Sequence, residues 1–155
     1  MAKPGKNKIS VREVYKYLMT FPGMTNDKAV GILTNIQAES AFYIDAVEMG
    51  DVKNKGLGLF QYTFPERKEA YKKQVPDWKT NWKGQIDFAM QEEEMKKYLA
   101  KNYDDAGDAT ESFMLTFEKP KDQSEEAIQK RVARVKNIYL GSARGKRNAI
   151  AKEIK

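Results

Sequence analysis

The sequence contains neither cysteine nor histidine among its 155 residues. Without cysteine the chain has no disulfide framework, no thiol nucleophile and no thiolate metal ligand. Without histidine, a Ser-His-Asp triad, a Cys-His pair and a histidine-based zinc site are all excluded. An enzyme built from this chain must use carboxylate, lysine, tyrosine, serine or threonine side chains, and we expect neither a metal nor a cofactor. Carboxylate acid–base catalysis is the commonest chemistry left, and glycoside hydrolysis is its main form.

Long apolar runs are also missing. No stretch approaches the roughly 18 apolar residues of a membrane span, and no apolar segment follows the basic N-terminus, so we expect no signal peptide. The composition, with 41% hydrophobic and 32% charged residues, is typical of one globular domain. The net charge of +6 predicts attraction to polyanions such as nucleic acid, anionic lipid or bacterial cell wall.

The chain order predicts a flexible basic arm over residues 1–9, a domain over 10–141, and a basic tail or short helix over 142–155. Apolar residues at helical spacing predict a first helix from Ser10 to about Thr20 and a more apolar second helix that ends near Glu39. Further helices are expected over 65–74, 83–102, 108–118 and 124–140.

Between the second predicted helix and the one expected over 65–74, apolar residues no longer recur at helical spacing. Glycine and asparagine in this segment favour turns. Short strands over 42–48 and 57–63, joined by a loop, are predicted there. The predicted fold class is α+β, mainly helical, with a small β-hairpin next to the end of the second helix.

Two acids stand at this junction of helix and strands. Glu39 ends the helix and Glu48 follows nine residues later, with Asp45 and Asp51 as competitors for the second place. Two such acids can flank a sugar, one giving its proton to the glycosidic oxygen and the other activating water or stabilising an oxocarbenium ion. Aromatic side chains could line a saccharide groove, although core packing is favoured for the two tryptophans. These aromatics are Tyr43, Tyr62, Trp78 and Trp82.

The segments GILTNIQAESAF and KGLGLFQYTFPER resemble the phage tail lysozyme family, which is part of the lysozyme-like superfamily. In that family a helix ends in a Glu-Ser pair, a hairpin follows, and a Gly-x-Gly-Leu-x-Gln-aromatic segment leads to an arginine. Here these motifs are Glu39-Ser40, residues 56–62 and Arg67. The later Phe117-Glu-Lys-Pro120 motif extends the resemblance, which covers about residues 11–140.

The resemblance implies a lysozyme-like fold, a glycan strand of peptidoglycan as substrate, and Glu39 as the general acid. It implies Gln61 and Tyr62 as cleft residues, and the nine-residue gap favours Glu48 as the second acid. The remaining candidates for substrate binding are Ser40, Tyr43, Asp45 and Arg67. The chain departs from the family pattern at Ala41, where glycine is usual, at Ile44, where proline is common, and at Tyr62, where tryptophan is usual.

Three functions remain open at this point. The first is a bacteriolytic muramidase of phage origin that cleaves the β-1,4 bond between N-acetylmuramic acid and N-acetylglucosamine. The second is a lytic transglycosylase with a single catalytic glutamate, and the third is an inactive virion protein that keeps the fold. A tail-associated protein would also contact tail or baseplate proteins, whereas a lysin would leave the host cytoplasm for the wall. Nucleic-acid binding is disfavoured because acids interrupt the basic residues, as on a solvated helix.

Overall fold

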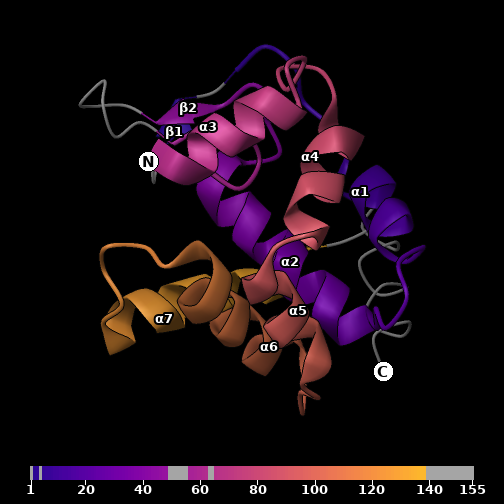
Figure 1. The fold of residues 1–155 in the computed structure, drawn as a ribbon. Coiled ribbons are helices and arrows are strands. Elements are labelled where there is room, and N and C mark those ends of the chain that lie inside the picture. Colours follow the sequence, from indigo (N-terminus) through magenta and orange to yellow (C-terminus); the bar gives the residue numbers. More distant parts are fainter. Residues whose placement is uncertain (1, 4, 49–55, 63–64, 139–155) are drawn as a thin grey trace.

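The computed structural model of the chain describes residues 2–3, 5–48, 56–62 and 65–138, and this part is mainly helical (Figure 1). The helices are α1 Val11–Leu18, α2 Asn26–Ser40, α3 Pro65–Gln74, α4 Trp82–Met90, α5 Glu93–Ala100, α6 Ala106–Phe113 and α7 Glu125–Val132. A π-helix, Met114–Glu118, follows α6, and a 3-10 helix, Ala133–Asn137, follows α7. The strands are β1 Ala2–Lys3 and β2 Val47–Glu48.

Helix α2 runs through the middle of the molecule and is the element on which the fold is built (Figure 1). It contacts α1, α6, α7 and β1. Its apolar side chains are fully buried: Ala29, Val30, Ile32, Leu33 and Ile36. The hydroxyl of Thr25 caps its first turn by accepting a hydrogen bond from the N–H of Lys28. Burial on nearly all sides explains why this helix is more apolar than its neighbours.

The predictions of α1, α2 and α3 are confirmed, α3 with the predicted bounds 65–74. The single long helix predicted over 83–102 is wrong, because the chain forms α4 and α5 with a break between them. Glu92 has an extended backbone at the break, with φ −78° and ψ 143°. No glycine or proline marks this position; instead the Glu92 carboxylate pairs with Arg67 of α3 there, a contact that local sequence does not encode.

In each of the last two predicted helices, only the first part is α-helical, and the rest forms another type of helix. The segment predicted over 108–118 begins as α6 and widens into the π-helix, whose final residue is followed by Lys119 in the left-handed conformation at φ 47°. The segment predicted over 124–140 begins as α7, continues as the 3-10 helix and ends at Asn137, with Ile138 extended. Residues 139 and 140 lie outside the described part.

The predicted hairpin of strands 42–48 and 57–63 is not seen in the part of the chain that the structure describes. Instead, β2 pairs in antiparallel fashion with β1, and Val47 makes only one isolated bridge with Leu57. Left-handed backbone at Gly58, with φ 77°, and Gln61, with φ 56°, turns the second segment back on itself and prevents an extended strand. The loop 49–55 lies outside the described residues.

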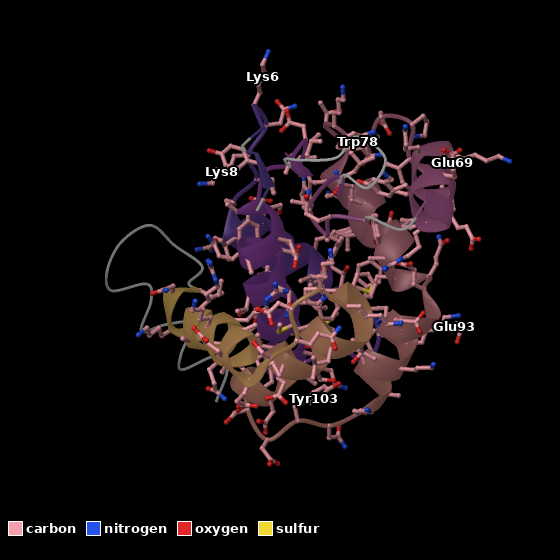
Figure 2. All side chains as sticks on the ribbon, turned by 90° about the vertical axis from the view of Figure 1, so that its left-hand side faces the viewer. Lys6, Lys8, Glu69, Trp78, Glu93 and Tyr103 are labelled. Atoms are coloured by element: carbon pink, nitrogen blue, oxygen red, sulfur yellow. The ribbon has the colours of Figure 1, made fainter. Side chains whose placement is uncertain are left out.

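The basic segment that precedes α1 lies against residues 42–48. The carboxylate of Asp45 accepts hydrogen bonds from the N–H groups of Lys6 (2.8 Å) and Asn7 (2.9 Å). The N–H of Ile44 in turn donates to the carbonyl of Asn7 at 2.7 Å. The Lys6 side chain extends away from the molecule (Figure 2). The described residues of this segment are thus tied to the domain, where we expected a flexible arm.

Aromatic side chains make up much of the hydrophobic core. Its larger members are Phe42, Phe60, Tyr62, Tyr71, Phe88, Tyr98, Phe113 and Phe117. Trp78 is buried against the same core, which confirms for this tryptophan the prediction of core packing. Among the described residues, no helix is long and apolar enough to cross a membrane.

Candidate functional site

The site is built at the C-terminal end of α2, where Glu39 is the last acid of the helix. The helix stops because two successive residues, Ala41 (φ 51°) and Phe42 (φ 66°), adopt the left-handed conformation. The N–H of Ala41 still closes the final turn onto the carbonyl of Gln37. The sharp exit leaves the Glu39 side chain half-buried, with 19% of its surface exposed.

Arg131 of α7 holds the carboxylate of Glu39. Its Nη1 atom lies 2.9 Å from Oε2 of Glu39 and donates to Oδ1 of Asn35 at 2.8 Å. Asn35 is fully buried, and its amide nitrogen donates to the carbonyls of Gly31 and Thr110. Because the amide is fixed on both sides, Arg131 is held in one position, and its positive charge favours the ionised form of Glu39.

A second ion pair lies between α3 and the start of α5. Arg67 donates from Nε to Oε2 of Glu92 at 2.7 Å and from Nη2 to Oε1 at 3.0 Å, which is bidentate geometry. The guanidinium also lies over the rings of Tyr62 (4.6 Å) and Phe117 (4.8 Å), and the Tyr62 hydroxyl donates to Glu92. Burial and the Glu92 charge raise the pKa of Tyr62 well above its usual range, so this hydroxyl stays protonated.

Glu118, at the end of the π-helix, is the third carboxyl of the group. Its Oε1 atom has no solvent-accessible surface and no hydrogen-bond partner among the described residues. Burial raises the pKa of Glu118 well above its usual range, and the negative charge of Glu39 raises it further. The positive charges of Arg131 and Arg67 lower it, but they do not outweigh the first two effects. Burial and the charge of Glu39 thus both favour the protonated form of the Glu118 carboxyl.

This arrangement has the chemical elements of acid–base catalysis. Two carboxyl groups in different environments, one ionised and one protonated, are how proteins keep an acid and a base at the same pH. The two guanidinium groups balance the charges of Glu39 and Glu92, so the five-residue cluster is neutral only if Glu118 keeps its proton. Only one of the three carboxyls, Glu39, follows from the sequence argument.

Three predicted substrate contacts are buried in the structure. Ser40 is 3% exposed and its hydroxyl donates to the carbonyl of Ile36. The Gln61 amide donates to the carbonyls of Ala46 and Gly58, which ties the turn to the segment before β2. Tyr62 is 2% exposed and belongs to the aromatic core. These three side chains thus serve packing and internal hydrogen bonding in this structure.

The other predicted site residues either make contacts within the protein or have side chains outside the described part. Arg67 is part of the second ion pair, and Asp45 is engaged by the N-terminal segment. Tyr43 is half-buried, with the Lys8 ammonium 5.4 Å from its ring centre. The backbone of Glu48 lies in β2, but its side chain is outside what the structure describes, as is Asp51.

Sequence reasoning missed Asn35, Arg131, Glu92 and Glu118 as parts of the site. The sequence holds a signal for two of these residues. Asn35 stands one helical turn before Glu39 on α2, and Glu118 is the acid of the Phe117–Pro120 motif. No local pattern links Arg131 or Glu92 to their partners, because each pair joins different helices.

The described residues hold no cluster of three or more histidine, cysteine, aspartate or glutamate side chains able to bind a metal ion.

Comparison with protein families matches residues 10–154, nearly the whole chain, to the family described as phage tail lysozyme. A search of curated proteins gives no match.

Proposed function

Because the chain belongs to the phage tail lysozyme family, whose function is lysozyme-like action on peptidoglycan, we propose that it is a muramidase. It hydrolyses the β-1,4 bond between N-acetylmuramic acid and N-acetylglucosamine, and Glu39 is its general acid. The observation that carries the proposal is the position of Glu39 at the end of α2. There it keeps exposed surface while Arg131 and Asn35 fix its orientation.

The general acid must carry a proton when the glycosidic oxygen leaves and must accept one back in the next cycle. Arg131 supports the ionised form of Glu39 that exists after the proton has been given to the leaving group. A second carboxylate stabilises the oxocarbenium ion or activates water, and Glu48 is our candidate because of its nine-residue spacing from Glu39. No metal or cofactor takes part in this proposal.

The test is the variant Glu39→Gln, assayed by the loss of turbidity of purified peptidoglycan. Removal of a general acid costs roughly 10²- to 10⁴-fold in rate, so we expect at least a 100-fold loss with an unchanged circular dichroism spectrum. The matched control is Glu69→Gln, a substitution of an exposed acid on α3 at the outside of the molecule (Figure 2). If Glu39→Gln lyses peptidoglycan as fast as Glu69→Gln, Glu39 is not the acid.

The released products define the reaction. Mass spectrometry of muropeptides gives reducing ends for a hydrolase and 1,6-anhydro-muramic ends for a lytic transglycosylase, in which one glutamate serves as both acid and base. We expect reducing ends that disappear in Glu48→Gln. Anhydro ends would replace our proposal with the transglycosylase, and a wild-type protein without any lytic product would be an inactive virion component.

For the biological setting we propose a tail-associated virion protein that opens the wall. The basis is the family description, which names tail lysozymes. Such a protein meets peptidoglycan from the virion and contacts other tail or baseplate proteins. Immunoelectron microscopy of virions tests this: labelled tails are expected, and label confined to the infected cell would indicate a lysin instead.

A further inference from the structure

Glu118 is the one carboxyl of the cluster that has no ion-pair partner of its own within the described chain. Glu39 pairs with Arg131 and Glu92 pairs with Arg67, each at under 3 Å. Glu118 as a whole keeps some exposed surface, but its Oε1 atom has none and makes no hydrogen bond. A carboxylate in that position would pay the full desolvation cost, whereas a carboxyl group that keeps its proton would not.

Glu118 follows a residue that contacts the second ion pair. Nη1 of Arg67 lies 3.5 Å from the carbonyl oxygen of Phe117, the residue before it. Glu39 and Arg131 are the charges that act on Glu118 most strongly, followed by Arg67 and Glu92. These four groups come from α2, α7, α3 and the start of α5, and the phenol of Tyr62 faces the same cluster.

We propose that Glu39 and Glu118 form a coupled carboxyl pair that holds a single proton beside Arg131, with Glu118 as the positioning residue that sets the pH range in which Glu39 acts as an acid. The balance is one proton exchanged between two carboxyl groups: Glu118 gives up its proton as Glu39 takes one, and Arg131 stays charged throughout. The inference rests on the proposed function, because it assigns the source of the proton that Glu39 delivers.

The pair accounts for a conflict within the site. A general acid must be protonated near neutral pH, yet the ion pair with Arg131 favours the carboxylate form of Glu39. Two carboxyl groups that share a site lose their protons in two separate steps, and the second step is displaced to higher pH by the charge left from the first. The pair therefore retains one proton above the pH at which a lone glutamate beside an arginine would lose its own.

The first test is the pH profile of lysis for Glu118→Gln, an isosteric variant that keeps a neutral side chain. In the wild type, activity ends on the alkaline side when the pair loses its last proton. In the variant, Glu39 titrates alone beside Arg131, so we expect the alkaline limb to move to lower pH by at least about one unit. The control is Glu126→Gln, an exposed acid on α7, which should keep the wild-type limb. Identical limbs in both variants would overturn the proposal.

The second test needs no activity and separates the pair from the proposed function. In protein with ¹³C-labelled glutamate carboxyl groups, NMR titration follows Glu39 and Glu118 directly. We expect Glu118 to titrate well above the usual glutamate range, and to return toward that range in Glu39→Gln, because the neighbouring charge is gone. A Glu118 resonance that titrates in the usual range, or does not respond to Glu39→Gln, refutes the pair. A coupled titration in a protein that lyses no peptidoglycan would refute the muramidase while leaving the pair standing.

Discussion

A single guanidinium nitrogen organises the end of α2. Nη1 of Arg131 reaches two acceptors, Asn35 and Glu39, that lie one helical turn apart on the same face. The buried amide of Asn35 cannot move, because its nitrogen is bonded to two backbone carbonyls. The orientation of the acid thus depends on a polar residue inside the core.

At residue 41 the chain uses an alanine where the backbone favours glycine. Ala41 has φ 51°, a left-handed conformation that costs a residue with a Cβ roughly 1–2 kcal/mol. We expect Ala41→Gly to raise the free energy of unfolding by about 0.5–1 kcal/mol, since the entropy of glycine in the unfolded chain offsets part of the gain. Urea denaturation measures this. A lower stability of the variant would mean that the methyl group of Ala41 makes a contact that outweighs the strain.

Substitution of Gly23 and Gly58 distinguishes the cost of left-handed backbone from the cost of steric contact. Gly58 and Gly23 both have positive φ, but a Cβ on Gly58 would lie 2.5 Å from the Tyr71 hydroxyl and 2.7 Å from Oε1 of Gln85, whereas a Cβ on Gly23 meets nothing within 4 Å. We expect Gly23→Ala to cost about 1 kcal/mol of unfolding free energy.

The same substitution at Gly58 should cost more, about 3 kcal/mol, because overpacking adds to the strain. Gln85 cannot yield easily, since its amide bonds to Leu59, Ile44 and Trp78. Chemical denaturation of both variants gives the difference directly. Equal losses would show that Gln85 and Tyr71 adjust without cost.

The N-terminal segment is attached to the domain through Asp45. Burial alone would raise the pKa of Asp45, but hydrogen bonds from the N–H groups of Lys6 and Asn7 outweigh it and lower the pKa below its usual 3.8. A lowered pKa in the folded state means that the ionised form contributes stability above pH 3.8, and that this contribution is lost as pH falls through the folded value.

We therefore expect Asp45→Ala to lower the free energy of unfolding by about 1 kcal/mol at pH 7, since exposed hydrogen bonds to a charged group contribute modestly. The loss should shrink as the pH falls below 3.8. Thermal unfolding across that range measures it, with Asp104→Ala at an exposed site as control. A loss of stability that persists unchanged in acid would mean that the Asp45 charge is not responsible.

Helices α3 and α5 are joined by the Arg67–Glu92 pair. Lysine cannot reproduce the bidentate contact or lie flat over Tyr62 and Phe117, so we expect Arg67→Lys to cost about 1–2 kcal/mol of unfolding free energy. Lys72→Arg on the exposed face of α3 is the control and should be neutral. Denaturant titration distinguishes the two, and equal stability of both variants would show that the pair contributes nothing net.

At the scale of the whole molecule, the net charge of +6 should govern adsorption to the wall. Raising the ionic strength from about 0.1 M to about 1 M shortens the screening length from about 10 Å to about 3 Å. We expect the fraction of protein bound to intact cell walls to fall several-fold over this range, as measured by co-sedimentation. Walls stripped of their anionic polymers are the control. Binding that ignores salt would mean that the glycan contacts alone retain the protein.

The helices could be predicted wherever one face of the chain is continuously buried. The apolar spacing in α2 and the cap residues Ser10 and Thr25 are local signals, and both hydroxyls make capping hydrogen bonds. The prediction was wrong where a distant partner decides the backbone, as at Glu92, or where left-handed residues turn a segment with strand-like composition, as at Gly58 and Gln61.

By itself, the sequence determined which chemistries are available, where the main helices lie, and that Glu39 stands at the end of the central one. The absence of histidine and cysteine and the order of short motifs are properties of the chain alone, so they need no fold. Only the tertiary structure decided what surrounds Glu39: Arg131 from α7, Asn35 within the core, and Glu118 without an ion-pair partner among the described residues. The reason is physical, since charge coupling depends on distance and burial, and both arise only when segments far apart in the sequence pack together.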